Sequence, residues 1–166
     1  MGLGEEKTAL QKHWINGELA LPRPEGFVVM SPEELARAYT CDNSDRWGMW
    51  DKKRHIMVTV LWQRYNPLLA WLADMKALVK RNEQLNRRGY KDHDYRLEGF
   101  RSRDVRGMAG EGYRFTYRLG DVVQRIDTVL VKKGRTVYSL SCIGRPENSA
   151  ADQAVFEAIL DGIEAR

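Results

Sequence analysis

The second half of the chain alternates apolar and polar residues in long runs, which predicts β-strands. Residues 112–119 carry aromatic side chains on one face and Arg or Thr on the other, as expected when side chains alternate across a strand. Residues 122–131 and 136–143 form two more runs, and the intervening turns at 120–121 and 132–135 are short. Strands joined by short turns pair as antiparallel neighbours. The pattern therefore predicts a three-stranded antiparallel meander.

Strand patterns are shorter in the rest of the chain. A β-rich run occupies residues 27–30, and residues 55–62 alternate with apolar side chains on both faces. The second pattern is typical of a central strand that is covered on both sides. Residues 95–100 and 102–107 predict two further short strands ahead of the meander.

Two helices are predicted in the first half of the chain. Ser31 and Glu34 have the spacing of a capping box with Pro at the first helical position, which predicts a short helix over 32–39. Asn66 caps the longest predicted helix, 67–88, and Gly89 follows its last turn. The apolar stripe of this helix has helical spacing and predicts one buried face. It consists of Leu68, Leu69, Trp71, Leu72, Met75, Leu78, Val79 and Leu85.

A third helix closes the chain, with Ser149 as its predicted cap and an apolar face. That face contains Val155, Phe156, Ile159, Leu160 and Ile163. Strands and helices are not in β-α-β alternation, so the fold class is α+β. We expect an antiparallel sheet of about six strands with a long central helix and a C-terminal helix packed on it, an α/β/α sandwich. We expect residues 27–166 to form one domain and residues 1–26 an N-terminal extension with little regular structure, apart from a short strand near residues 14–15 or 19–21.

The composition is that of a globular domain, and the positive charge is concentrated in one stretch of the chain. The 166 residues are 43% hydrophobic and 30% charged, with a net charge of +4, which excludes a disordered or fibrous chain. The positive excess lies in residues 76–106, which hold 10 basic and 5 acidic residues. The flanking parts, 1–75 and 107–166, are nearly balanced.

The basic stretch 76–106 is the candidate binding surface. Its main cations are Arg87, Arg88, Lys91, Arg96, Arg101, Arg103 and Arg106. Tyr90, Tyr95 and Phe100 lie between them, and aromatic residues among cations suit an acidic partner such as single-stranded nucleic acid. The alternative is a helix end followed by a solvated strand, which is what most charge runs are.

Trp47 and Trp50 complete the candidate surface. The alternation around them predicts an edge strand, and exposed aromatic side chains there would anchor a protein partner. The alternative is that they pack under the N-terminal extension. The other tryptophans near them in sequence, Trp62 and Trp71, fit buried positions.

Patterns of catalytic chemistry are absent from the sequence. The three histidines, His13, His55 and His93, have no ligand spacing, and no Cys-x-x-Cys, P-loop or nucleophile elbow occurs. The glycine cluster at 107–112 precedes a strand, so it predicts a turn or bulge and not a phosphate cradle. We therefore expect no catalytic residue, no metal and no cofactor.

The termini and cysteines indicate a cytoplasmic protein. The first residues are acidic where a signal peptide is apolar, and no apolar run has the length of a membrane span. Cys41 and Cys142 could pair, but two cysteines in a chain of this size suit a reducing compartment.

The order of elements resembles the PsbP-like superfamily, which includes PsbP, the Ran-binding Mog proteins and DcrB-like proteins. The likeness covers Phe27 to Ile163 and is carried by the strand 56–62 before a helix, the meander, and the phrase 135–142 followed by the helix 148–163. It implies an antiparallel sheet between helices and a non-enzymatic adaptor, chaperone or assembly factor. The long helix 67–88 and the short helix 32–39 are departures from this pattern. The resemblance transfers no functional residue.

Three functional hypotheses follow from the sequence. The first is a small binding protein whose partner is another protein. The second is a binder of nucleic acid or another acidic ligand through residues 76–106. The third is an enzyme or small-ligand carrier with a pocket between sheet and helices, which a polar pocket with His55 or His93 would support.

Overall fold

A seven-stranded antiparallel sheet forms the centre of the molecule in the computed structural model, which describes residues 11–38, 45–72 and 74–166. In spatial order its strands are β3 (Val28–Val29), β4 (Arg46–Asp51), β5 (Ile56–Arg64), β9 (Thr136–Gly144), β8 (Val122–Lys133), β7 (Met108–Leu119) and β6 (Arg96–Val105). Consecutive strands β6 to β9 pair in sequence order, which confirms the predicted meander. β5 lies between β4 and β9, the central position that its two apolar faces predicted.

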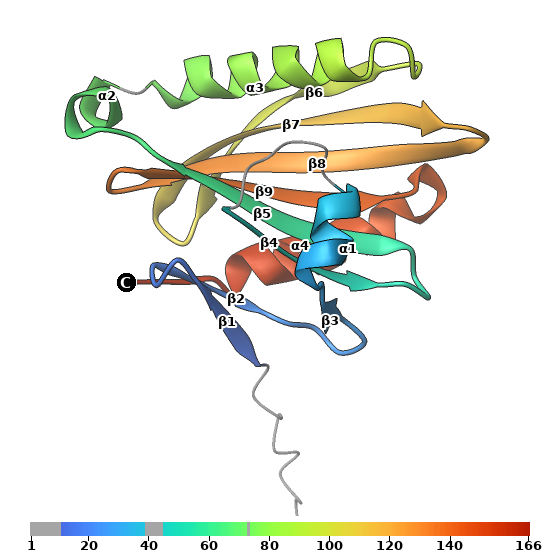
Figure 1. Ribbon diagram of the computed structural model, residues 1–166, viewed down its shortest axis with the longest axis horizontal. Coiled ribbons are helices and arrows are strands. Elements are labelled where there is room, and N and C mark those ends of the chain that lie inside the picture. Colours follow the sequence, from blue (N-terminus) through green and yellow to red (C-terminus); the bar gives the residue numbers. More distant parts are fainter. Residues whose placement is uncertain (1–10, 39–44, 73) are drawn as a thin grey trace, which may run out of the picture.

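Helices cover both faces of this sheet (Figure 1). The helix α3 (Met75–Gly89) packs on β7 and β8, and α4 (Ser149–Asp161) packs on β9 from the opposite face. A short 3-10 helix, Pro146–Asn148, leads into α4. The short helix α1 (Pro32–Ala38) contacts β4, and α2 (Pro67–Leu72) precedes α3. The predicted α+β class and α/β/α layering are confirmed.

A second, small sheet closes the core beside α4. The N-terminal hairpin β1 (Lys12–Ile15) and β2 (Leu19–Pro22) pairs with the C-terminal strand β10 (Glu164–Ala165). Ile15, Leu19 and Leu21 are buried in the same apolar cluster as α4. The sequence predicted one short strand here, near residues 14–15 or 19–21, and the structure has a strand at both places. The segment is more regular than expected because β2 pairs with β10 at the far end of the chain.

Each face of the main sheet carries its own apolar cluster. On the α4 face, Phe156, Ile159 and Leu160 pack against buried strand residues and the small sheet. On the α3 face, the aromatic side chains of β7 pack under Val79 of α3. These are Tyr113, Phe115 and Tyr117, with ring centroids 5.6 and 6.2 Å apart. The predicted aromatic face of residues 112–119 is thus the contact surface for α3.

The predicted helix 67–88 is in fact two helices, α2 and α3. Asp74 is the N-cap of α3, and its Oδ1 accepts a hydrogen bond from the backbone N–H of Lys76 at 3.1 Å. A carboxylate in this position satisfies the N–H groups that a helix start leaves unpaired. The chain therefore begins a second helix at Met75, in a new direction (Figure 1).

Other helix boundaries agree closely with the sequence. The capping box of α1 is present: Ser31 Oγ accepts from Glu34 N at 3.2 Å, and Glu34 Oε1 accepts from Ser31 N at 3.0 Å. α4 has Asn148 as its N-cap, one residue before the predicted Ser149. Tyr39, in the predicted first helix, lies outside the described residues.

The glycine cluster 107–112 was predicted as a turn or bulge, and only its first residue is in the turn. β6 runs unbroken from Arg96 to Val105, and β7 begins at Met108. Gly110 and Gly112 are paired strand residues, opposite Arg103 and Arg101 of β6. The two short strands predicted over 95–107 are therefore one strand with a register shift between Leu97 and Gly99.

Candidate functional site

The cations of the basic stretch are divided between the two faces of the sheet. On the α3 face, Arg87 binds Oε1 of Glu83 through Nη2 at 2.6 Å and Nε at 2.9 Å. On the α4 face, Arg101 and Arg103 of β6 both contact the carboxylate of Glu157 in α4. Strand residues two apart share a face, and the sheet separates that face from α3. The structure does not bring Arg87 and Arg101 together.

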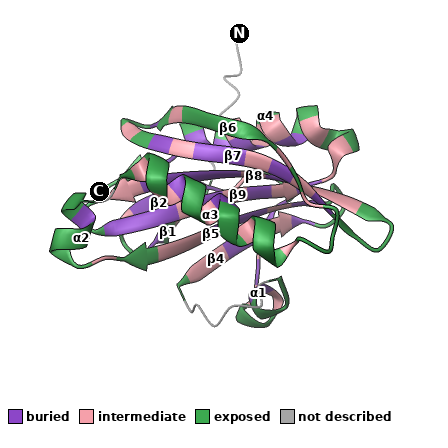
Figure 2. Cartoon of the chain, turned by 90° about the horizontal axis from the view of Figure 1, so that it is seen from above, coloured by how far each residue is buried: buried purple, intermediate pink, exposed green. Residues whose placement is uncertain are grey.

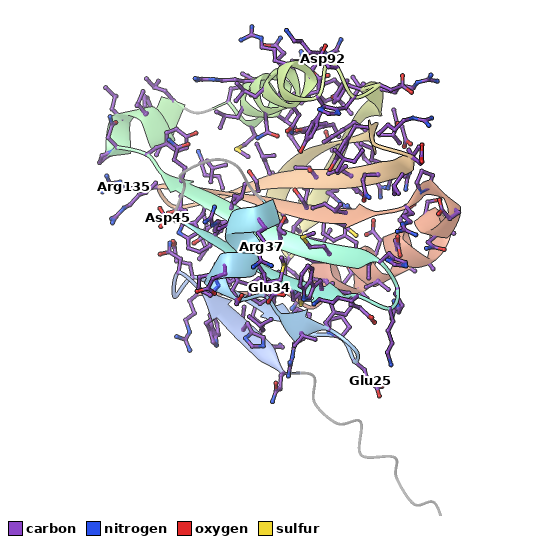
Figure 3. All side chains as sticks on the ribbon, turned by 45° about the vertical axis from the view of Figure 1, so that its right-hand side comes forward. Glu25, Glu34, Arg37, Asp45, Asp92 and Arg135 are labelled. Carbon is purple, nitrogen blue, oxygen red and sulfur yellow. The ribbon has the colours of Figure 1, made fainter. Side chains whose placement is uncertain are left out.

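The remaining cations of the stretch have separate surroundings. Arg96 lies 3.4 Å from Asp94, and Arg106 Nε donates to the carbonyl of Ile163 at 3.2 Å. Arg88 and Lys91 are exposed at the end of α3, near Asp92, which is labelled in Figure 3. Binding of nucleic acid through residues 76–106 stays a prediction.

No sequence pattern singled out Glu83 of α3, which is a buried charged residue. Its carboxylate is buried beneath α3 and accepts hydrogen bonds from Arg87 and from Tyr95 Oη at 3.0 Å. Burial and the neighbouring carboxylate raise the pKa of Tyr95 above its ordinary value. The cluster orders the chain after α3, because it ties the helix to the start of β6.

Trp47 and Trp50 are both half-buried on β4. Trp47 packs against the main core and lies 5.6 Å, ring to ring, from His13 of the N-terminal hairpin. Trp50 carries the ammonium of Lys52 4.5 Å above its ring. β4 has β3 beside it and is not the edge strand expected from the sequence. That the two tryptophans anchor a protein partner stays a prediction.

The three histidines lie apart from one another in the structure. His55 lines a shallow pocket of about 250 Å³ with Asp51, Lys52 and Arg145. His93 lies in the turn after α3 and contacts the edge of the Tyr90 ring. Among residues 11–38, 45–72 and 74–166, no group of three or more potential ligands could hold a metal ion. Within the same ranges, no helix has the length and apolar character to cross a membrane.

A small polar cavity of about 20 Å³ lies between α4 and the sheet. Asp152 of α4 and Cys142 of β9 line it, and both are buried. The thiol of Cys142 is free, and burial raises its pKa, which keeps it protonated and unreactive. Cys41 lies outside the described residues. Burial also raises the pKa of Asp152, against the lowering effect of a hydrogen bond from the Arg145 backbone.

The raised pKa of Asp152 predicts that Asp152→Asn gains stability relative to wild type as pH rises. The folded state holds the proton more tightly than the unfolded state, whose pKa is near 3.8. The unfolding free energy of wild type therefore falls as pH rises from about 4 through the raised pKa. Asparagine carries no charge, so the unfolding free energy of the variant does not fall in this way. Urea unfolding at several pH values measures the difference, with the exposed Asp161→Asn as the matched control on the same helix. A difference that does not change between about pH 4 and 7 would contradict the prediction.

The most exposed apolar surface of the described chain is the α2 patch, defined as Leu68, Leu69, Trp71 and Leu72. Their exposed fractions are 65%, 52%, 81% and 61%. Only Ala70 of this helix is buried, and Lys132 Nζ of β8 donates to its carbonyl at 2.8 Å. The prediction that these four residues form a buried stripe was wrong. The break before α3 leaves α2 too short to lie on the sheet, so its large side chains face solvent.

A groove of about 300 Å³ lies beside the α2 patch, between α3 and the strands β5 and β9. Leu78, Arg81 and Leu85 of α3 form its wall, and Leu61 of β5 and Val137 of β9 lie in its floor. Leu85 is 58% exposed. Seen from above, β5 and β4 emerge from one side of α3 (Figure 2). We call this feature the α3 groove.

The floor of the α3 groove is a part of the sheet that no helix of the described residues covers. On β5 and β9, the residues that face α4, such as Val60 and Leu140, are fully buried. Their neighbours Leu61 and Ser139, which face the groove, are only half-buried. α3 packs over β7 and β8 while α1 packs on β4. Within residues 11–38, 45–72 and 74–166, no helix covers the strip between α1 and α3.

Comparison with known proteins finds its matches among solved structures. No protein-family model matches the sequence, and no curated protein matches it. The structure of PsbP (CyanoP) from Synechocystis sp. PCC 6803 is similar, with a TM-score of 0.72 and 12% identity, over 100% of this chain and 98% of that chain. LpqN from Mycobacterium tuberculosis, described as involved in cell envelope biogenesis, has a TM-score of 0.52 and 12% identity, over 93% and 90%.

A protein from Bacteroides thetaiotaomicron VPI-5482 has a TM-score of 0.63 and 8% identity, over 95% of this chain and 49% of that chain. At such low identities the likeness concerns the fold and carries no site residue. It extends over 93% or more of this chain in each case. The chain therefore has the PsbP-like fold that its order of elements indicated.

Proposed function

We propose that this protein is a non-enzymatic binding protein, acting as an adaptor, chaperone or assembly factor through protein–protein contact at the α2 patch and the α3 groove. The observation that carries the proposal is the α2 patch. Burying a large apolar side chain stabilises a protein by about 1.5–3 kcal/mol. A six-residue helix that leaves four such side chains mostly in solvent forgoes this stabilisation, as binding surfaces do before the partner covers them.

The test is affinity purification from the source cell followed by mass spectrometry, with the full chain as bait. Leu68→Asp and Trp71→Asp place a charge at the centre of the α2 patch and are expected to abolish capture of the partner. Truncation of a central aromatic anchor alone costs about 2 kcal/mol or more of binding free energy, roughly a thirtyfold loss of affinity. Both residues are exposed, so the variants are expected to fold, which circular dichroism checks.

Leu119→Asp is the matched control for these variants. Leu119 is also an exposed leucine, 48% accessible, but it ends β7 at the opposite end of the sheet from α2 (Figure 1). We expect Leu119→Asp to retain the partner. Recovery of the same proteins with wild type and both patch variants would overturn the proposal, and so would turnover of a metabolite without any protein partner.

A further inference from the structure

We propose that the α3 groove binds an acidic, amphipathic segment of the partner protein, with apolar side chains on the floor of the groove and carboxylates toward its basic rim. The inference rests on the proposed function and names the chemistry of the segment that docks there. Its basis is the combination of three features in one place: a groove of limited size, polar groups within it, and cations around it.

The size of the groove suits a few side chains of an extended or helical segment. Its volume of about 300 Å³ is at the lower end of the range of small-ligand pockets, about 300–1,000 Å³. Leu61, Leu78 and Leu85 offer apolar contacts along it. A helix that docks in such a groove anchors through side chains spaced three or four residues apart. The α2 patch extends this apolar surface beyond the groove, since Tyr65, which lines the groove, lies two residues before Pro67, the first residue of α2.

Polar groups within the groove make it unsuitable for a wholly apolar occupant. Gln63 of β5, Ser139 of β9 and Asn82 of α3 line it together with Arg81. A buried hydrogen-bonding group left without a partner costs free energy, so an occupant must offer polar groups as well. Arg81 in particular favours a carboxylate, with which a guanidinium forms paired hydrogen bonds.

The charge around the groove is positive. Residues 61–91, which supply β5's end, α2 and α3, contain seven basic and two acidic residues. Both acids are already engaged: Asp74 caps α3, and Glu83 binds Arg87 and Tyr95. The pairing with Glu83 also engages Arg87, which leaves six cations in this segment. Such a field attracts an acidic segment and raises its rate of association.

Arg135 is one further cation, and it lies at the end of the groove where Arg64 of the same segment is found. Arg64 ends β5 and is exposed, and Arg135 occupies the turn between β8 and β9, where its Nε donates to the carbonyl of Tyr65 at 3.0 Å. Figure 3 shows Arg135 at the same side of the molecule as α2. Asp45 is labelled nearby and already has an interaction partner. The local excess of positive charge thus remains on the side where the groove and the α2 patch meet.

The experiment is selection of random 12-residue peptides displayed on phage, against the immobilised full chain at low salt. We expect enriched peptides to combine Asp or Glu with Leu, Phe or Trp at helical spacing. Fluorescence anisotropy of the synthetic peptides then measures affinity. Arg81→Glu and Leu85→Asp are each expected to weaken binding about tenfold or more, and affinity is expected to fall as salt rises. Arg118→Glu, an exposed charge reversal near the end of β7, is the control and is expected to leave affinity unchanged.

The possible results separate this inference from the proposed function. Enriched peptides that are neutral or basic, and whose binding depends on Leu85, would overturn the inference that the bound segment is acidic. They would leave the proposed protein binding at this site intact. Peptides insensitive to Arg81→Glu and Leu85→Asp, or none enriched, would overturn the groove as a docking site.

Two other occupants are measured in parallel. Vesicles of phosphatidylcholine with and without phosphatidylglycerol test an anionic membrane surface, and light scattering of wild type and Leu85→Asp tests a second copy of the chain. Binding to anionic vesicles that Arg81→Glu abolishes, or a dimer that Leu85→Asp dissociates, would overturn the inference.

Discussion

Phe156→Ala is expected to lower the free energy of unfolding by about 3–5 kcal/mol. The side chain is 1% exposed and joins α4 to the main sheet and the small sheet. Three elements surround the space that the ring would vacate, and none can move in without losing its own contacts. The loss therefore includes the cost of a cavity as well as the lost burial. Urea unfolding followed by tryptophan fluorescence measures it.

Val155→Ala is the control for this prediction, because Val155 is the half-buried neighbour on the same helix. Its expected loss is about 1 kcal/mol, since part of the side chain stays in water in the folded state. If Phe156→Ala lowers the free energy of unfolding no more than Val155→Ala does, the packing of Phe156 between α4 and the two sheets is contradicted.

Gly112→Ala is expected to destabilise the protein by about 3 kcal/mol, although it adds one methyl group. A Cβ atom at this position would lie 2.4 Å from the carbonyl oxygen of Thr128 on the neighbouring strand β8. That oxygen belongs to the backbone, and β8 is paired on both sides. Relief of the clash requires a shift of the sheet itself, which makes this substitution costlier than a clash with a flexible side chain.

Gly89→Ala provides the comparison. Gly89 ends α3, and nothing lies within 4 Å of the position that its Cβ would take. Alanine has the higher helix propensity, so the variant is expected to be neutral or more stable by up to about 1 kcal/mol. Thermal unfolding of both variants measures the contrast. Equal midpoints for the two would contradict the close approach of β7 and β8 at Gly112.

The elements predicted correctly from the sequence are those specified by neighbouring residues. The meander β7–β8–β9 depends on alternation and short turns, and the capping box of α1 involves residues three apart. Such signals lie within one window of the sequence. The start of the C-terminal helix was placed to within one residue for the same reason, while its end lies at Asp161, two residues before the predicted Ile163.

Two of the errors have a different origin, since each depends on residues that are far apart in the chain. The glycine cluster resembles a turn until β8 approaches Gly112 closely enough to exclude a side chain. The N-terminal segment resembles an irregular extension until β10, more than a hundred residues later, pairs with β2. The error over the stripe from Leu68 to Leu85 is local in origin, because the Asp74 cap that starts a new helix accepts its hydrogen bond from Lys76, two residues on.

The sequence by itself determined the α+β class, the meander, the order of elements and the excess of positive charge in residues 76–106. Only the tertiary structure decided which apolar and charged residues share a surface. Periodicity assigns a side chain to a face of its own element, but exposure depends on what packs against that face. The basic stretch was divided because β6 turns Arg101 and Arg103 toward α4 while α3 holds Arg87 on the other side. The α2 patch became the candidate site because no described element covers Trp71 and its neighbours.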